Sequence, residues 1–158
     1  MTVLGIDPGT SIVGYGAVRE TDGKLFCLSY GAIRAKEKVH ADRLLTIAKS
    51  VNRLIKDLKP DLMVLERLFF FKNQKTALSV AEARGVITLV ARKNKVDLVE
   101  LTPLELKRYF TGYGRASKEG VQKMLKLILN LKELPQPDDA ADALALAVLG
   151  SGRKRGLT

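Results

Sequence analysis

Hydrophobic residues gather in three early runs of the chain, and each run, bounded by turn residues, is typical of a β-strand. Pro8-Gly9 turns the chain after the first run, and Asp22-Gly23 turns it after the second. Short loops between three consecutive strands favour an antiparallel meander. A later run, "LMVLE", is apolar until its last residue, which suits a central strand covered on both faces. The predicted strands are residues 3–7, 12–19, 24–33, 62–66 and 96–101.

Apolar residues recur at spacings of three and four through most of the remaining chain, which is the helical period. The clearest stripe lies in residues 39–58, and Pro60 ends that helix. In "TPLE", Thr102 has the features of an N-cap and Pro103 those of a first helical residue. The predicted helices are residues 39–58, 76–93, a short piece after Pro103, one beginning at Ser117, and 138–149.

The order of these elements is β-β-β-α-β-α-β-α-α-α, which predicts an α/β fold with a mixed sheet and helices packed on its faces. A chain of 158 residues is long enough for one domain with a substantial core. We expect that domain to occupy residues 1–150, and we expect the basic, polar segment 151–158 to be a disordered tail.

Basic residues outnumber acidic ones by 27 to 17, which gives a net charge of +10. This balance favours a polyanionic partner, and nucleic acid is the first expectation. No apolar run approaches the roughly 18 residues of a membrane span, and the N-terminus enters a strand pattern without a basic leader. The single cysteine, Cys27, is expected to be a core thiol. Together these features predict a cytoplasmic protein in a reducing compartment.

Two of the predicted strands end in an acid, Asp7 in the first and Glu66 in the fourth. A carboxylate beside a buried strand is costly unless it is paired, hydrated or bound to a cation. If the two strands are parallel neighbours, both carboxylates meet at the edge where ligands gather in open α/β sheets. Two structural alternatives stay open: Asp7 as a turn residue, and Glu66 as a strand-end charge paired with a base.

The last predicted helix carries further acids in the stretch "PDDAADALALAV". Asp139 and Asp142 are three residues apart and share a helix face, and the alanines let that helix lie close to a sheet. Acids from separate elements suit metal-assisted phosphoryl transfer with two Mg²⁺ ions, which prefer carboxylate, water and phosphate oxygens. Asp138 is interpreted as the N-cap of this helix, although Asp138 and Asp142 are also spaced to share a face.

The stretches "GIDPGTSIVGYG", "LERLFFFKNQKTALSVAEARG" and "PDDAADALALA" closely resemble the RuvC family of Holliday junction resolvases, in the family's order and spacing. The resemblance implies a ribonuclease H-like fold, with a five-stranded mixed sheet flanked by helices. It also implies a structure-selective endonuclease of recombination and repair. Such an enzyme is a homodimer that binds a four-way DNA junction and makes two symmetric nicks, leaving 5′-phosphate and 3′-hydroxyl ends. The cofactor would be Mg²⁺, two ions per site with Mn²⁺ as a substitute, and a branch-migration motor complex would be a partner.

The resemblance also assigns roles to individual residues. Carried over by motif, the catalytic and metal-binding acids fall on Asp7, Glu66, Asp139 and Asp142, and the functional lysines fall on Lys107 and Lys118. These lysines would contact phosphates or support the charge of the transition state. In "LFFFKNQK", the DNA-contacting aromatic would be Phe69, and Lys72, Asn73 and Lys75 suit contacts to the DNA backbone. The alternatives are solvated lysines and phenylalanines that pack in the core or in a dimer interface.

Three other functions compete with this interpretation. "DPGTS" resembles the first phosphate-binding turn of actin-like ATPases and sugar kinases, but those proteins need two such domains and no second Asp-Gly-Thr segment is present. A resolvase-like nuclease acting on RNA or another branched substrate would share the fold. A non-catalytic junction-binding module is disfavoured, because four carboxylates facing phosphates would weaken binding. His40 has no metal-ligand partners at the usual spacings and is expected at the surface.

Overall fold

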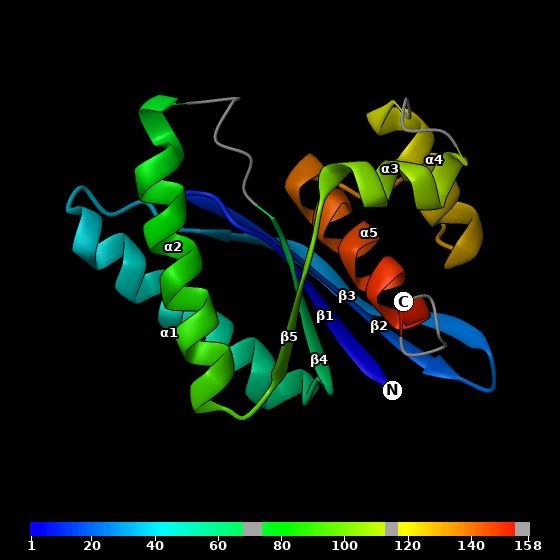
Figure 1. Ribbon diagram of the computed structural model, residues 1–158, viewed down its shortest axis with the longest axis horizontal. Coiled ribbons are helices and arrows are strands. Elements are labelled where there is room, and N and C mark those ends of the chain that lie inside the picture. Colours follow the sequence, from blue (N-terminus) through cyan, green and yellow to red (C-terminus); the bar gives the residue numbers. More distant parts are fainter. Residues whose placement is uncertain (68–73, 113–116, 154–158) are drawn as a thin grey trace.

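The computed structural model describes residues 1–67, 74–112 and 117–153, and it places all of the strands in one sheet. The strand order is β3-β2-β1-β4-β5, as Figure 1 shows. The first three strands pair antiparallel, whereas β4 is parallel to both β1 and β5. The predicted meander and the parallel pairing of the first and fourth strands are therefore confirmed. The strands are β1 (Thr2–Asp7), β2 (Ile12–Thr21), β3 (Lys24–Arg34), β4 (Leu62–Glu66) and β5 (Asp97–Leu101).

In the described part of the chain, helices α1 and α2 cover one face of the sheet, and α3, α4 and α5 lie on the other (Figure 1). Successive side chains of β1 point to opposite faces of the sheet, and each face has a hydrophobic core. Leu4 and Ile6 pack beneath α1 and α2, and Val3 packs beneath α5. Across the described ranges, no helix is both long and apolar enough to cross a membrane. The helices are α1 (His40–Leu58), α2 (Gln74–Lys93), α3 (Pro103–Thr111), α4 (Lys118–Ile128) and α5 (Asp138–Arg153).

Helix α5 lies unusually close to the sheet because glycines in the strands face it. A Cβ atom at Gly5 of β1 would lie 2.0 Å from the carbonyl oxygen of Ala143. A Cβ atom at Gly16 of β2 would lie 2.4 Å from the Cα atom of Leu144. Any side chain at these strand positions would push the helix away, so the backbone of α5 rests directly on β1 and β2.

The helix starts follow the predicted capping chemistry. The Thr102 hydroxyl accepts a hydrogen bond from the Glu105 backbone, and the Glu105 carboxylate accepts one from the Thr102 backbone, which completes a capping box before α3. Ser117 caps α4 by accepting a bond from the backbone N–H of Gly120 at 3.1 Å. Both caps fix where the chain enters a helix on the α5 side of the sheet.

The final helix extends further than its hydrophobic pattern predicts. It continues to Arg153, so residues 151–153 of the predicted disordered tail are helical, and residues 154–158 lie outside the described ranges. Gly150 accounts for the extension, because it brings the helix against Val64 and Val3, and a Cβ atom there would lie 2.4 Å from a methyl of Val64. Ser151 is buried and donates a hydrogen bond to the carbonyl of Val148 at 2.7 Å.

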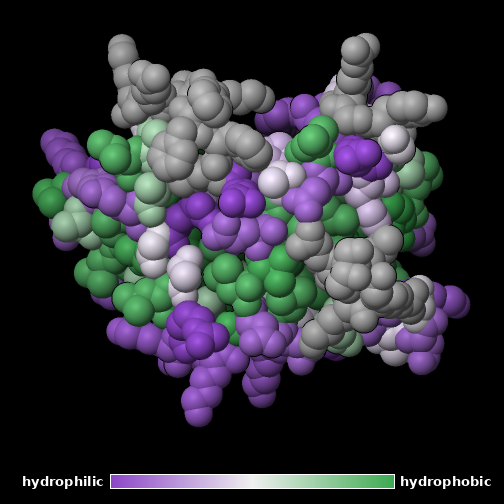
Figure 2. Space-filling model, in the orientation of Figure 1, coloured by the Kyte–Doolittle hydropathy of each residue, from purple (hydrophilic) through white to green (hydrophobic). Residues whose placement is uncertain are grey.

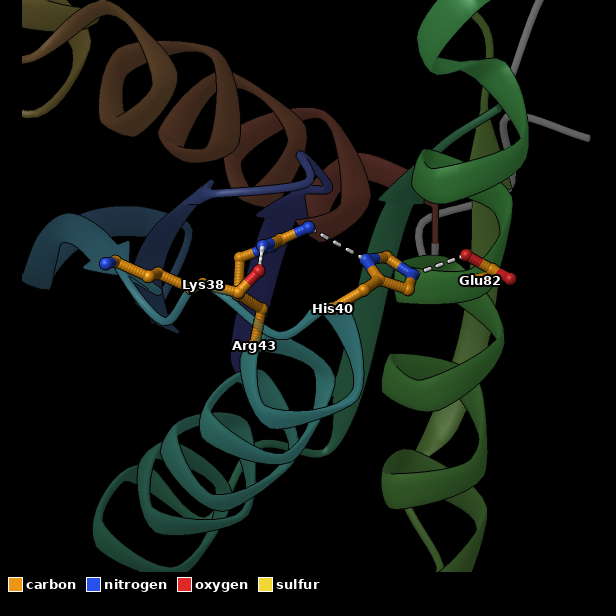
Figure 3. A network of polar contacts seen from close by, with 4 residues as sticks. All are labelled: Lys38, His40, Arg43 and Glu82. Atoms are coloured by element: carbon orange, nitrogen blue, oxygen red, sulfur yellow. Dashed lines mark hydrogen bonds and ion pairs between the residues drawn. The ribbon is translucent and has the colours of Figure 1, made fainter.

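On the other face, a polar network joins α1 to α2 (Figure 3). The Arg43 guanidinium donates to Nδ1 of His40 at 3.1 Å, and Nε2 of His40 lies 2.5 Å from a carboxylate oxygen of Glu82. Because Arg43 is only a donor, Nδ1 must accept, which leaves Nε2 to carry the hydrogen toward Glu82. His40 thus lies at the surface, as expected from the sequence, where it is partly exposed and links two helices.

Candidate active site

The first two candidate acids stand side by side at one end of the sheet. Strands β1 and β4 are parallel neighbours, and their last registered pair is Ile6 with Leu65. Asp7 and Glu66 are the next residue on each strand, so they occupy adjacent positions. Both lie on the face that packs against α5, because side chains alternate along each strand. The predicted meeting of these carboxylates therefore has its structural basis in the strand register.

Helix α5 brings the third and fourth acids to the same place. Gly14 of β2 is the strand partner of Asp7, and a Cβ atom at Gly14 would lie only 3.0 Å from the Cβ of Asp139. Asp139 thus sits directly over the partner of Asp7. Asp142 follows one helical turn later and is partly buried. Three elements that are distant in the sequence therefore place four carboxylates at one edge of the sheet.

The charges of these four acids act on one another. Burial is the main cause that raises the pKa of Asp7 from 3.8 to about 7, and the negative charges of Glu66, Asp142 and Asp139 add to it. Burial also raises the pKa of Asp142. Removal from water and like-charge repulsion both disfavour ionised carboxylates, so Asp7 lies in a strongly negative environment that a cation would relieve.

Lys118, the first residue of α4, supplies a positive charge at the rim of this cluster. Its Nζ atom lies 3.5 Å from Oδ2 of Asp142 and 3.9 Å from Oδ2 of Asp138. Asp142 is the main cause that raises the pKa of Lys118, and Asp7 adds a smaller effect. The structure thus brings Lys118 to the candidate acids. The sequence pattern around it would fit equally well a lysine on a solvent-exposed helix face.

Asp138 has a different position from the N-cap that was predicted. It is the first residue of α5, and its Oδ1 atom accepts a hydrogen bond from the Gln122 side chain of α4 at 3.1 Å. The backbone N–H groups of Ala140 and Ala141 bond to the carbonyl of Pro137 instead. The carboxylate of Asp138 therefore connects two helices.

The donor set is suited to a hard divalent cation, because all four candidate side chains are carboxylates and the most buried of them is surrounded by like charge. Within residues 1–67, 74–112 and 117–153, however, no group of three or more His, Cys, Asp and Glu side chains already forms a metal cage. Oδ2 of Asp142 faces Lys118, so a cation that binds this oxygen competes with the lysine for it. The residues present agree with Mg²⁺ in chemistry and charge, and their side chains must move closer together to surround it.

The remaining candidate DNA contacts are less fully described. Lys107 lies on α3, directly after β5, and is partly buried. Lys75 lies in the first turn of α2. Phe69, Lys72 and Asn73 lie outside the described residues, so their predicted contacts stay predictions.

Two residues at the site were missed by sequence reasoning. Gly14 sets the separation between β2 and α5, and Gln122 holds Asp138. The spacing of Gly5, Gly14 and Gly16 on paired strands is a signal that a helix backbone approaches the sheet. Gln122 offered only one signal, a polar residue beside the apolar stripe of α4.

Comparisons with known proteins agree over nearly the whole chain. A family model described as crossover junction endodeoxyribonuclease RuvC matches residues 3–150. A curated protein of that name from Moorella thermoacetica is 50% identical over 149 residues, which cover 94% of this chain and 89% of the relative. The protein of that name from Fusobacterium nucleatum is 44% identical over 149 residues, covering 94% of this chain and 78% of the relative.

A solved structure gives the same result for the fold. The structure described as Thermus thermophilus RuvC in complex with Holliday junction substrate superposes with a TM-score of 0.92 at 30% identity. The match covers 98% of this chain and 95% of that chain. It confirms the predicted ribonuclease H-like fold, a five-stranded mixed sheet flanked by helices.

Proposed function

The chain belongs to the RuvC family of crossover junction endodeoxyribonucleases, and we propose that it resolves four-way DNA junctions by paired, symmetric nicks during recombination and repair. The observation that carries this proposal is the convergence of Asp7, Glu66, Asp139 and Asp142 at one edge of the sheet of a strongly basic protein. A cluster of carboxylates on a basic protein suits an enzyme that binds a polyanion and places one phosphate against cations.

The four acids would hold Mg²⁺, with Mn²⁺ as a substitute, and two ions per site fit the number of carboxylates. When bound, these ions supply the positive charge that activates water and stabilises the leaving oxygen. Asp7 would have the central role, because its strand lies between that of Glu66 and that of Gly14, which contacts Asp139. The products are 5′-phosphate and 3′-hydroxyl ends.

Lysines near the four acids would contact the DNA backbone. Lys118 already stands beside Asp142, so a phosphate that approaches the acids meets its ammonium group. Lys107 has the same proposed role from α3, and Phe69 would stack on or wedge between unpaired bases. Lys72, Asn73 and Lys75 complete the proposed DNA contacts.

A second copy of the chain is the proposed partner that makes the paired nicks possible. Leu78 and Leu89 of α2 are 77% and 54% exposed, and Gly85 lies between them with no atom within 4 Å of where a Cβ would be. These positions share one face of the helix. On the side where α1 and α2 lie, hydrophobic surface is visible among hydrophilic residues (Figure 2). This face supports a homodimer, and cytoplasmic action with a branch-migration motor complex is proposed from the resemblance to the family.

Cleavage of a synthetic four-way junction tests the proposal. The purified protein is incubated with a labelled junction, with linear duplex and with an RNA–DNA hybrid, each with Mg²⁺ and with EDTA. We expect paired, symmetric, ligatable nicks in the junction alone, and only with Mg²⁺. Cleavage of the hybrid instead would point to another substrate, and binding without cleavage under any divalent metal would favour a non-catalytic module. ATP binding without cleavage would favour the ATPase alternative.

A further inference from the structure

Lys118 occupies a place that its own helix does not favour for a cation. It is the first residue of α4, where free backbone N–H groups and the helix dipole favour negative charge. The lysine is compensated by acids of the next helix, because Asp142 lies 3.5 Å and Asp138 lies 3.9 Å from its Nζ atom. These two acids are four residues apart on α5 and share one side of it. The ammonium group thus lies between two anions, and only Asp142 belongs to the proposed metal-binding set.

Asp138 is held in place by a buried side chain. Its Oδ1 atom accepts a hydrogen bond from Nε2 of Gln122 at 3.1 Å, and its other oxygen faces Lys118. Gln122 is only 9% exposed and lies within α4, beside the buried core residues Val121 and Leu125. A buried amide needs a polar partner, so this bond restrains the carboxylate, which is 57% exposed and would otherwise be free to rotate. The restrained carboxylate keeps its second oxygen toward the lysine.

Lys118 and a divalent cation compete for Asp142. Both are positively charged, and a cation bound to Asp142 would repel an ammonium group only a few ångströms away. With no second acid nearby, the 69% exposed lysine would be free to turn into solvent. Asp138 offers an alternative anion that lies outside the cluster of four carboxylates.

We propose that Asp138, oriented by Gln122, is a positioning residue that retains the Lys118 ammonium beside the acidic site when a divalent cation takes Asp142. This inference rests on the proposed function, in which Lys118 contacts a DNA phosphate at that site. The lysine moves from Asp142 toward Asp138 as the cation binds. Its charge therefore stays where the phosphate arrives.

The position of the Lys118 ammonium can be followed without DNA, by NMR of its ¹⁵N-labelled Nζ group. An ammonium held by a carboxylate exchanges its hydrogens slowly enough to give a signal, and one in free solvent does not. The signal is assigned by its loss in Lys118→Arg. We expect the wild type to keep the signal in EDTA and in saturating Mg²⁺. We expect Asp138→Asn to keep it in EDTA and to lose it in Mg²⁺.

Two further variants make the test specific. Gln122→Leu leaves every charge in place but frees the Asp138 carboxylate, so it should also weaken the Mg²⁺-state signal. Glu119→Gln removes a charge beside Lys118, but its partner is Lys123 at 2.7 Å, and it should behave like the wild type. Loss of the wild-type signal in Mg²⁺, or its retention in Asp138→Asn, would overturn the inference. The NMR experiment contains no DNA, so its outcome does not depend on junction cleavage. Failure of cleavage would overturn the proposed function, whereas the NMR signals would still test the role of Asp138.

Discussion

Gly14 and Asp139 are in backbone contact: a Cβ atom at position 14 would lie 1.9 Å from the carbonyl oxygen of Asp139. Gly14 is also the strand partner of Asp7. One missing side chain therefore sets the separation between an acid of the sheet and an acid of the helix.

Gly14→Ala should displace the start of α5 and disable the site while most of the fold remains. A contact of this kind is made to backbone and has no flexible side chain that can yield, so we expect destabilisation of about 1–3 kcal/mol or more. A shift of the acids by about 1 Å should lower the cleavage rate about 100-fold. Urea denaturation and junction cleavage measure the two effects.

The matched control is Gly152→Ala at the other end of α5. Among the described residues, a Cβ atom there meets Tyr109 at 3.9 Å, which is an ordinary contact, so the variant should fold and cleave as the wild type does. Equal cleavage by Gly14→Ala and the wild type would show that the close approach of α5 is not needed for activity.

The stability of the metal-free protein should depend on Asp7 in a defined pH window. Folding raises the pKa of Asp7 from 3.8 to about 7, so between these values the folded state holds a proton that the unfolded state releases. The contribution of Asp7 to the free energy of unfolding is therefore greatest below about pH 4. It falls as the pH rises to about 7, and it is constant at higher pH. The asparagine of Asp7→Asn does not ionise, so this variant does not lose stability as the pH rises. It should be about 2–4 kcal/mol more stable than the wild type at pH 8 in EDTA.

Urea denaturation at pH 4 and pH 8 measures this difference. At pH 4 the variant and the wild type should be nearly equal. Asp57→Asn is the control, because Asp57 is an exposed acid of α1 whose partner is Arg53. A stability difference between Asp7→Asn and the wild type that is the same at both pH values would contradict the buried, repelled carboxylate described for Asp7.

Metal binding should depend on the sheet acids. We expect Mn²⁺ to bind the wild type and to bind Glu66→Gln at least about tenfold more weakly, because one charged oxygen ligand is removed. Electron paramagnetic resonance of free Mn²⁺ measures the affinity. Glu133→Gln, which changes an exposed acid before α5, should bind as the wild type does. Unchanged affinity in Glu66→Gln would remove Glu66 from the metal-binding set.

The exposed face of α2 should control the oligomeric state. Leu89→Lys places a charge on the face that we propose for the dimer, so the variant should be monomeric at concentrations where the wild type is dimeric. Analytical ultracentrifugation measures this. Leu127→Lys on α4 is the matched control, since Leu127 is 74% exposed and lies on the other side of the sheet. A dimer that survives Leu89→Lys but dissociates in Leu127→Lys would place the interface on α4.

Much of the fold was predictable because local signals agreed with the final structure. The turn at Pro8-Gly9, the cap at Thr102 and the helical stripe of residues 39–58 each depend on neighbours in the sequence, and each appears in the structure. The acids Asp7 and Glu66 were found because a charge that ends an apolar strand conflicts with burial. Such a conflict is visible in sequence alone.

Contacts between distant elements were not predictable in the same way. The bond from Gln122 to Asp138 and the ion pair from Lys118 to Asp142 depend on how α4 lies beside α5. No periodicity encodes that arrangement. The helical residues 151–153 were missed because Gly150 usually signals a helix end, whereas here it permits contact with Val64.

The most direct test of the four-acid site compares binding and cleavage of a four-way junction by Asp7→Asn. Binding is measured in EDTA and cleavage in Mg²⁺, each beside the wild type. We expect cleavage to be abolished, while binding is equal or tighter because one negative charge fewer faces the DNA phosphates. Cleavage at the wild-type rate, or loss of binding together with cleavage, would contradict the central role assigned to Asp7.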